Sequence, residues 1–516
     1  MAQNSTNFDA IVIGGGHNGL TAASVLARKG KRVCLLERSG SLGGMMSVGG
    51  SDDAQTPPRL AHLLYNLNPT VEREIGLQLQ TKALKTISLS PDGQHVEIDG
   101  PRTRMMNGQP HEKAVAYGVL HDRFVRYAKL LSTLSTRTPP KLSGSWTDPE
   151  TFGELMALAG MGWGLKRMGK AEMREFLRIL LTNVHDLAVD ELGDGPLAGA
   201  LAADALRGAF SGPKAPGTLF SLLYRFGNSG QVLTPVGGMS AAVKAFEDAA
   251  QRAGCELRCH AAVERVLVED DCAVGVTLGD GTTLKAKAVF SSAGPLATIQ
   301  LAGLENFDVE IARRAKNLRA KGTAAKLNLK LSALPSFKEL PEDLHGERLL
   351  IAPSSEYVER AFNPVKYGRI SSAPSMEILL PHAKDPRASQ WLSAIVSYVP
   401  YQPDGGWTAD KRDEVQKTAL STLEAYAPGL SGLIQHAELL TPADIEKETG
   451  AAGGHWHHGE MGIDQILNVR PINGMAHYHC GVKGLYLCGA SAHPGGDISG
   501  APGRNSALQA LKDGVV

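Results

Sequence analysis

The stretch between residues 8 and 37 constrains the fold of this chain more than any other part. It reads FDAIVIGGGHNGLTAASVLARKGKRVCLLE. An apolar run at 10–13 leads into a Gly-x-Gly-x-x-Gly motif at 14–19, a segment with helical spacing of its apolar residues, and a second apolar run at 33–36. This order predicts a strand, a glycine turn, a helix and a second strand, which is the βαβ unit of dinucleotide-binding domains.

Each glycine of the motif has its own physical role in such a unit. Gly14 permits the tight turn, Gly16 lets the backbone approach a pyrophosphate, and Gly19 lets the helix pack closely on the strand. The N–H groups and partial positive charge at the helix N-terminus favour phosphates. Glu37 is placed to accept hydrogen bonds from a ribose diol and would repel a 2′-phosphate. The motif therefore predicts FAD or NAD(H) rather than NADP(H).

The position of this unit favours FAD over NAD. It lies at the N-terminal end of the sequence, as is common in flavoproteins of the glutathione-reductase type. Arg38 follows the second strand, and the glycine pair Gly43-Gly44 then lets the chain run along the dinucleotide. A plain flexible turn is the alternative interpretation of that pair.

Length and composition exclude several other classes of protein. With 516 residues the chain exceeds a single core, so we expect two or three domains. Lys plus Arg and Asp plus Glu number 53 each, which gives no electrostatic argument for binding nucleic acid. The six cysteines form no Cys-x-x-Cys pair, which argues against a redox-active disulfide. No secretory signal pattern and no run of about 18 apolar residues occurs, so the sequence predicts a cytoplasmic protein.

Interleaved patterns along the chain predict an α/β fold in which one domain is built from separated segments. Strand-like runs return at 255–291 and at 484–489, whereas 80–115 is typical of β-hairpins, 352–375 of a loop and 409–427 of a helix. We expect a glutathione-reductase-type, Rossmann-like FAD domain with an inserted α+β substrate domain. The expected FAD-binding parts are 1–78, 226–299 and 431–516, and the expected substrate parts are 79–225 and 300–430.

A helical segment predicted at 150–182 carries Met156, Met161, Met168 and Met173 in an amphipathic pattern. Such a stripe is typical of an ordinary core. The alternative is a pliable wall for an apolar substrate or a surface for lipid, because methionine side chains adapt to irregular apolar partners. Under this alternative we expect the protein to make peripheral contact with a membrane.

The C-terminal end carries a second glycine-rich turn. An apolar run at 484–488 ends at Gly489, and the turn that follows contains Gly495 and Gly496 before a helix predicted at 506–511. A strand, a glycine-rich turn and a helix N-terminus again form a site for anions and carbonyl groups. We expect the ribityl chain and the isoalloxazine edge of a flavin to lie over this turn.

Together these motifs resemble those of the phytoene desaturase-like flavoproteins, and in particular the pyridine nucleotide-disulfide oxidoreductase domain-containing branch. The resemblance spans nearly the whole chain. Besides both glycine-rich ends, it rests on Pro235-x-Gly237-Gly238-Met239, Leu63-Leu64-Tyr65 and Arg470-Pro471. It implies non-covalent FAD and hydride or proton–hydride chemistry on C–C or C–X bonds of mostly apolar molecules.

Carried over residue by residue, the resemblance implies a set of cofactor contacts. The ADP half is expected at Gly14, Gly16, Gly19, Glu37, Arg38, Gly43 and Gly44, the adenine at the backbone of Val263, and the flavin at Gly489, Ser491, Gly495, Gly496, Asp497 and Ile498. Two positions depart from the pattern. Ala490-Ser491 stands where many flavoproteins of this broader class have an Asp on the ribityl hydroxyls. Asp497 stands where carotenoid enzymes usually have an uncharged residue, which argues against a purely hydrocarbon substrate.

Histidines near the flavin are the natural candidates for proton transfer, because the pKa of imidazole lies close to physiological pH. The predicted catalytic residues are His493, His455, His458 and Asp497, and His62 and Tyr65 are predicted to line the substrate pocket. For the loop with His455 and His458, a hydrogen-bonded surface loop and a metal site are alternatives. We expect no metal, because the helical i, i+4 spacing of ligands is missing. Asp464 and Arg470 are expected to form an ion pair that anchors the last strand.

These observations predict an FAD-dependent dehydrogenase or desaturase that acts on an apolar or amphipathic small molecule. Three alternatives stay open. They are a flavin oxidase of amines or alcohols that uses O₂, an FAD-dependent isomerase, and a non-catalytic flavoprotein that serves as a binding or assembly partner. The sequence indicates neither the electron acceptor nor the oligomeric state.

Overall fold

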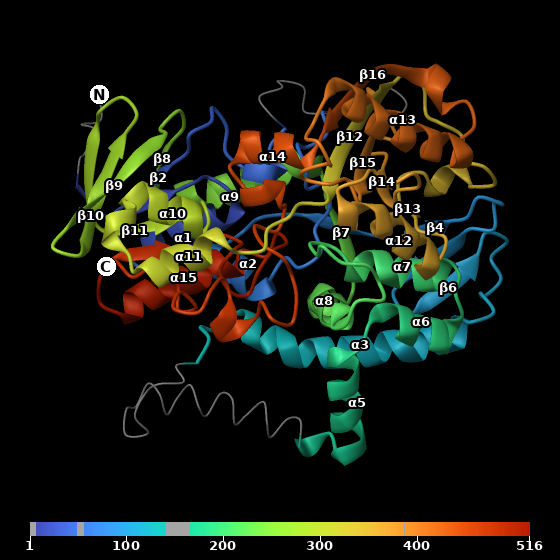
Figure 1. Ribbon diagram of the computed structural model, residues 1–516, viewed down its shortest axis with the longest axis horizontal. Coiled ribbons are helices and arrows are strands. Elements are labelled where there is room, and N and C mark those ends of the chain that lie inside the picture. Colours follow the sequence, from blue (N-terminus) through green and yellow to red (C-terminus); the bar gives the residue numbers. More distant parts are fainter. Residues whose placement is uncertain (1–6, 49–55, 141–165, 386–387) are drawn as a thin grey trace.

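The computed structural model describes residues 7–48, 56–140, 166–385 and 388–516. Two large β-sheets lie next to each other along the longest axis of the molecule, and helices pack on both (Figure 1). The first sheet is built around the predicted βαβ unit. The α/β architecture predicted from the sequence is confirmed.

Seven strands from the N-terminal, central and C-terminal parts of the chain form the first sheet. In spatial order they are β8 (Glu256–Arg258), β2 (Val33–Leu36), β1 (Asn7–Ile13), β11 (Thr283–Ser291), β10 (Cys272–Leu278) and β9 (Val263–Glu269), with β17 (Leu485–Leu487) paired to β11 outside this path. β1, β2, β8, β11 and β17 pair in parallel, whereas β9, β10 and β11 form an antiparallel meander. β2, β17 and the last four residues of β1 are apolar and buried, as expected for strands covered on both faces.

Helices cover this sheet and bring the two ends of the chain together. They are α1 (His17–Arg28), α2 (Pro69–Ile75), α9 (Gly238–Arg252), α10 (Pro295–Ala302), α11 (Val309–Lys316) and α15 (Ala501–Lys512). α1 packs against both α9 and α15. A Cβ atom at Gly503 would lie 2.0 Å from the carbonyl oxygen of Asn18, so the two helices approach as closely as their backbones permit.

Eight strands form the second sheet. Their order is β16 (Ile434–Leu440), β12 (Ala324–Leu331), β15 (Gln390–Ser397), β14 (Met376–Leu379), β13 (Arg348–Ile351), β4 (Thr86–Leu89), β5 (Val96–Asp99) and β6 (Arg102–Met105). β16 therefore belongs to this sheet, although the sequence predicted residues 431–516 to be part of the FAD-binding domain. Its long antiparallel pairing with β12 explains the difference.

Side chains alternate between the two faces of this sheet with the period of two that strands impose. On β12, Leu327 and Leu329 join the apolar core beneath α13 (Ala409–Tyr426), and the buried Lys326 next to them points to the opposite face. On β14, Ile378 faces the same core, and the buried Glu377 points away from it. The face opposite α13 therefore carries buried charged groups.

A layer of helices covers part of that opposite face (Figure 1). It comprises α3 (Ala114–Ser135), α6 (Val184–Leu192), α7 (Pro196–Ala205), α8 (Thr218–Arg225) and α12 (Ser355–Phe362), whereas α5 (Lys170–Leu181) packs on α8 and projects away from the layer. α14 (Pro442–Thr449) and a two-stranded sheet of β3 (Thr81–Leu84) and β7 (Val232–Pro235) lie between the two large sheets (Figure 1).

Two predictions of local structure differ from the observed elements, and a third falls partly outside the described residues. The segment 352–375 is not a simple loop, because Ser354 caps α12 by accepting a hydrogen bond from the N–H of Tyr357 and the helix buries one apolar face. The small-residue pattern of 196–210 also predicts a helix over that whole range, but α7 ends at Ala205. Met156 and Met161 of the predicted 150–182 helix lie outside the described residues, which include α5.

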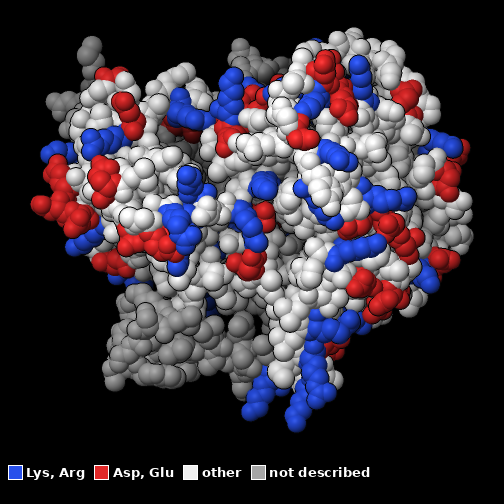
Figure 2. Space-filling view, in the orientation of Figure 1, with Lys and Arg blue, Asp and Glu red and all other residues white. Residues whose placement is uncertain are grey.

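Acidic and basic side chains are interspersed over most of the molecular face that Figure 2 shows. Among the described residues, no helix combines the length and the apolar character needed to cross a membrane.

Candidate active site

The main cavity, of about 530 Å³, lies at the carboxyl ends of the parallel strands of the first sheet. Ile13 and Leu36 end β1 and β2 and line it, as do Ser292 after β11 and Gly489 after β17. Ligands of open α/β sheets bind at this edge. The predicted residues that line the cavity are Gly14, Gly16, Gly19, Glu37, Arg38, Gly43, Gly44, His62, Val263, His458, Gly489, Asp497 and Ile498.

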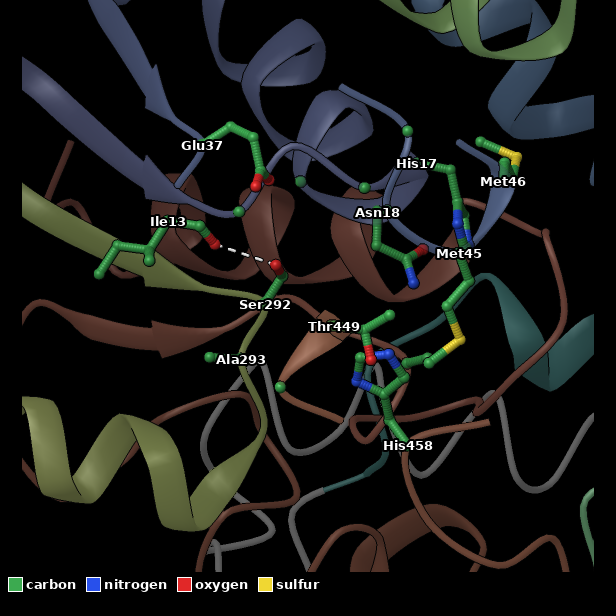
Figure 3. A pocket seen from close by; sticks show the side chains of 18 of the residues that line it. Ile13, His17, Asn18, Glu37, Met45, Met46, Ser292, Ala293, Thr449 and His458 are labelled. Atoms are coloured by element: carbon green, nitrogen blue, oxygen red, sulfur yellow. Dashed lines mark hydrogen bonds between the residues drawn. The ribbon is translucent and has the colours of Figure 1, made fainter. Parts of the chain in front are cut away.

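The glycine motif has the geometry that a dinucleotide requires. Gly14 has a φ of +98°, and a Cβ there would lie 2.2 Å from the hydroxyl of Ser292, which donates to the Ile13 carbonyl (Figure 3). A Cβ at Gly19 would lie 2.0 Å from the Gly14 carbonyl oxygen. At Gly16, which caps α1 without a side-chain hydrogen bond, a Cβ would meet no atom within 4 Å. The helix N-terminus is therefore open to a phosphate group.

Glu37 extends toward this turn (Figure 3). Its Oε2 accepts a hydrogen bond of 2.7 Å from the N–H of Gly15, and its Oε1 accepts bonds of 2.9 and 2.7 Å from the N–H and hydroxyl of Ser39. A carboxylate has about four acceptor positions. One position is therefore left for the predicted bond from a ribose hydroxyl.

Several polar atoms at the cavity lack hydrogen-bond partners among the described residues. Nε2 of His17, Oδ1 of Asn18 and Nδ1 of His457 are buried without a partner. Burial and the neighbouring His458 lower the pKa of His17 to about 4, and burial and Arg470 lower the pKa of His458 to about 4. Buried unpaired polar atoms are costly, so their presence indicates a polar ligand in the cavity.

Six of the predicted residues do not line the main cavity: Tyr65, His455, Ser491, His493, Gly495 and Gly496. Gly495 and Gly496 pack instead against Met461 and His457, where added Cβ atoms would lie 2.7 and 2.3 Å from side-chain atoms. His493 lines a smaller cavity of about 90 Å³, and its Nε2 lies 3.0 Å from the Leu134 carbonyl oxygen.

The loop with the three histidines is buried rather than on the surface. His455 and His457 are 1% and 4% exposed, and His457, which the prediction did not include, lines the cavity with its Nε2 3.6 Å from Asp497. Burial lowers the pKa of both imidazoles well below the usual value. No group of three or more potential metal ligands is arranged around a metal position in the part of the chain that the structure describes.

The predicted ion pair between Asp464 and Arg470 is wrong. Asp464 pairs with Arg319, and the buried guanidinium of Arg470 donates to the carbonyl oxygens of Ala490 and Ala492 at 2.9 and 3.3 Å. Burial lowers the pKa of Arg470 to about 10. Arg470 therefore holds the C-terminal turn through its backbone.

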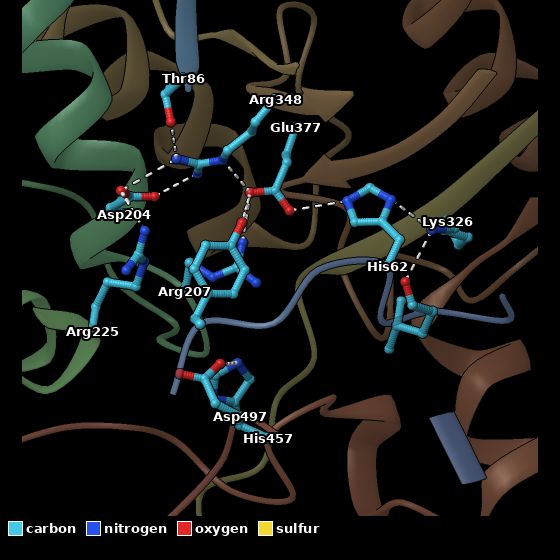
Figure 4. A network of polar contacts seen from close by, with 12 residues as sticks. His62, Thr86, Asp204, Arg207, Arg225, Lys326, Arg348, Glu377, His457 and Asp497 are labelled. Atoms are coloured by element: carbon cyan, nitrogen blue, oxygen red, sulfur yellow. Dashed lines mark hydrogen bonds and ion pairs between the residues drawn. The ribbon is translucent and has the colours of Figure 1, made fainter. Parts of the chain in front are cut away.

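A buried network of charged side chains reaches the cavity from the second sheet (Figure 4). Its centre is Glu377, whose carboxylate accepts hydrogen bonds from Arg348 at 2.8 Å, from Arg207 at 2.9 Å and from the hydroxyl of Tyr65. His62 Nε2 lies 3.0 Å from the other carboxylate oxygen. Arg207 and His62 line the cavity, whereas the predicted pocket residue Tyr65 lies behind them in the network.

Lys326 and Asp204 extend the network on either side. Lys326 donates to Nδ1 of His62 and to the carbonyl oxygen of Leu60, both at 3.0 Å, so His62 donates its Nε2 proton to Glu377. Asp204 pairs with Arg348 and lies 3.7 Å from Arg225. These contacts neutralise charges that are too costly to bury alone.

Burial and the neighbouring charges set the protonation of the network. Burial lowers the pKa of His62 to about 4 and that of Lys326 to about 7. Burial alone would raise the pKa of Glu377, but Arg207 and Arg348 hold it well below its usual range. Glu377 is therefore ionised, and His62 is neutral at physiological pH.

The sequence did carry a signal for part of this network. Lys326 and Glu377 interrupt apolar runs in AAKLNLKL and MEIL, and a charged residue between buried neighbours on a central strand needs a buried partner. Arg207 carries no such signal, because it follows the end of α7 and reaches Glu377 only through the tertiary fold.

Two family models match the chain. A model described as FAD dependent oxidoreductase matches residues 9–128, and one described as flavin containing amine oxidoreductase matches residues 171–503, which is more than half of the chain. The chain belongs to the flavin-containing amine oxidoreductase family. It is an FAD-dependent oxidoreductase, and the predictions of FAD as cofactor and of an enzyme are confirmed.

Relatives of known sequence include desaturases and dehydrogenases. The chain is 29% identical to mouse pyridine nucleotide-disulfide oxidoreductase domain-containing protein 2, covering 98% of this chain and 94% of that protein. It is 24% identical to a component of the limonene dehydrogenase from Castellaniella defragrans, over 98% and 94% of the two chains. It is 25% identical to phytoene desaturase of Fusarium fujikuroi, over 94% and 85%. The resemblance to this group is confirmed.

Solved structures share the fold. An oxidoreductase from Methanosarcina mazei matches with a TM-score of 0.59 and 16% identity, over 98% of this chain and 99% of the other. A putrescine oxidase with bound putrescine matches with a TM-score of 0.57 and 13% identity, over 99% of each chain. The prediction of a Rossmann-like FAD-binding domain is confirmed.

Proposed function

We propose that this enzyme is a dehydrogenase or desaturase that oxidises an apolar or amphipathic small molecule. The observation that carries the proposal is the composition of the cavity that the glycine turns share with the second sheet. Beyond the turns, its wall combines apolar side chains of Leu60, Leu63 and Trp456 with polar groups of His62 and Arg207. Such a wall suits a molecule with an apolar body and one polar end.

The residues of the chain would bind the substrate, exclude water and take up a proton. Bound FAD supplies a hydride acceptor at its flavin N5. When a C–H bond of the substrate gives up its hydride, a proton leaves the neighbouring atom and needs a base. His457, His458 and Asp497 line the cavity and are placed to accept that proton. Burial lowers the pKa of the two imidazoles, which weakens them as bases, and raises the pKa of Asp497, which strengthens it.

The names of two relatives support an apolar substrate. Limonene and phytoene are hydrocarbons, and the proteins named for acting on them align with nearly the whole of this chain. The buried charges of this cavity argue for a substrate that carries a polar group as well.

Anaerobic titration of the FAD-loaded protein tests the proposal. Amphipathic alcohols, acids and polyenes should bleach the visible absorbance of the flavin roughly tenfold faster than amines of equal length. Stoichiometric H₂O₂ from amines in air would support the amine oxidase alternative instead. Flavin that no compound of either class bleaches would favour the non-catalytic alternative.

A cytoplasmic location and peripheral contact with a membrane are further parts of the proposal. All six cysteines are free thiols, which fits a reducing compartment. On α5, Leu177 and Leu181 are 47% and 61% exposed, next to the basic Lys170 and Arg174. An amphipathic helix with this composition suits the surface of an anionic membrane, and co-sedimentation with anionic vesicles tests it.

A further inference from the structure

Arg207 occupies a position at the cavity between two aromatic rings. Its Cζ lies 3.9 Å from the centre of the Tyr65 ring and 4.7 Å from the centre of the Trp456 ring. Two aromatic faces around a positive charge form the type of cage that proteins use to bind ammonium groups. Here the guanidinium of the chain itself fills the cage.

A substrate ammonium group is therefore excluded from this cage. Arg225 and Arg348 also lie over the Tyr65 ring, at 4.2 and 5.6 Å, so three guanidinium groups surround it. In a buried site of low dielectric constant, each of them repels a further cation.

The charges of these arginines are not fully matched by the carboxylates that they contact. Arg207, Arg225 and Arg348 share two carboxylates, Asp204 and Glu377. Among the described residues, Arg207 forms an ion pair with Glu377 alone, and its buried Nε has no hydrogen-bond partner.

Asp497 is the next carboxylate at the cavity, and it is engaged elsewhere. Its Oδ2 accepts a hydrogen bond of 2.7 Å from Asn66, and its Oδ1 faces His457. Burial raises the pKa of Asp497, although the nearby Arg207 and Arg225 oppose that shift, and Asp497 forms no ion pair with the Arg207 guanidinium. A donor of the guanidinium is thus left for an oxygen acceptor.

We propose that Arg207 binds a carboxylate group of the substrate, which makes the substrate class an amphipathic carboxylic acid rather than an amine. This inference rests on the proposed function and narrows it. The guanidinium matches a carboxylate in shape and charge, and Leu60, Leu63 and Trp456 offer apolar surface for the rest of the molecule.

Three eight-carbon probes test the inference in the FAD-loaded protein: octanoate, octanamide and octylamine. They share the apolar tail and differ in the charge of the head group. Binding is followed by the perturbation of the flavin spectrum and by tryptophan fluorescence, with Trp456→Phe identifying the signal of the nearby ring. We expect octanoate to bind at least about tenfold more tightly than octanamide, and octylamine to bind most weakly.

Variants of Arg207 assign the preference to this side chain. In Arg207→Met the affinities for octanoate and octanamide should come within about twofold of each other, and Arg207→Lys should keep part of the difference because it retains the charge without the planar fork. The control Arg319→Gln removes a half-exposed arginine that does not line the cavity, and this variant should keep the full preference for octanoate over octanamide.

The inference and the proposed function fail in different ways. The carboxylate site would be overturned if octylamine bound to the unmodified protein as tightly as octanoate, a result that depends on no variant. It would also be overturned if the tenfold preference for octanoate persisted in Arg207→Met. If octanoate bound tightly through Arg207 but no acid, alcohol or polyene reduced the flavin, the carboxylate site would stand and the proposed dehydrogenase activity would be overturned.

Discussion

The two walls of the cavity are built in different ways. On the side of the first sheet, the wall is mostly backbone. Its glycines stand where a Cβ would strike the Ser292 hydroxyl, as at Gly14, or the carbonyl oxygen of the turn, as at Gly19, or would enter the cavity, as at Gly16. On the side of the second sheet, the wall consists of charged and aromatic side chains such as Arg207 and Trp456. A backbone wall suits the invariant phosphates of a cofactor, and a side-chain wall suits the selection of a substrate.

The walls also differ in how far apart in the sequence their parts lie. The glycine motif and Glu37 lie within one βαβ unit. By contrast, Glu377 contacts Tyr65, Arg207 and Arg348, which come from three separate segments of the chain. Damage to the first wall should therefore remove the cofactor from a folded protein, and damage to the second should destabilise the fold itself.

The largest expected effect is on the backbone wall. Replacing Gly16 with Val should abolish FAD binding, because the added side chain enters space that is free of protein atoms and that the pyrophosphate needs. The purified variant should be colourless and should keep the circular dichroism of the wild-type protein. Gly195→Val is the matched control: Gly195 also caps a helix and its Cβ position is also free, but it does not line the cavity. A yellow Gly16→Val protein would contradict the assignment.

The next largest effect is on the side-chain wall. Glu377→Gln removes the charge that Arg207 and Arg348 share, and breaking a buried ion pair in this way costs about 3–5 kcal/mol. Denaturant unfolding should show this loss. The control Glu356→Gln breaks an exposed pair with Lys214 and should cost about 0–1 kcal/mol. Equal losses in the two variants would show that the network contributes no more than a surface pair.

The backbone wall was predictable because its physics is local. Gly14, Gly16, Gly19 and Glu37 follow the strand and helix pattern at a fixed spacing, and each of them lines the cavity. The period of two in the strands was equally visible in the sequence, but it shows only that Lys326 points away from its apolar neighbours. What it contacts depends on how strands far apart in the sequence pair.

The failures in the site have the same origin. The sequence placed Tyr65 and His455 at the pocket because of their residue types, whereas the fold buries both behind residues that line it. Arg470 was paired with Asp464 because of their opposite charges, but its donors are used by backbone carbonyl groups of the C-terminal turn. Arg207 was missed because a single arginine after a helix has no local pattern that distinguishes it from a surface residue.

A smaller effect tests Glu37, a side chain of the backbone wall. Glu37→Ala should weaken FAD binding by about 1–3 kcal/mol, since the N–H groups of Gly15 and Ser39 lose their acceptor together with the predicted ribose contact. Titration of FAD into the apoprotein measures the change. Glu264 also lines the cavity, and Glu264→Ala should change the affinity less because Glu264 makes no hydrogen bond to the glycine turn among the described residues. Equal losses of FAD affinity in Glu37→Ala and Glu264→Ala would show that Glu37 acts only through its charge.

The last test concerns Lys326, whose effect on stability develops gradually with pH. Burial lowers the pKa of Lys326 from 10.5 to about 7 in the folded protein, so between these values the unfolded chain holds a proton that the folded chain has lost. Stability contributed by this residue must therefore rise with pH across that window, by up to about 1.4 kcal/mol per pH unit. In Lys326→Met this rise is absent. The free energy of unfolding of the wild-type protein, relative to that of the variant, should increase from about pH 7 to about pH 9.5, whereas the exposed control Lys417→Met should run parallel to the wild-type protein. If instead the free energy of unfolding of Lys326→Met ran parallel to that of the wild-type protein, the side-chain wall would keep Lys326 charged. The lysine would then hold its proton next to His62 throughout the physiological pH range.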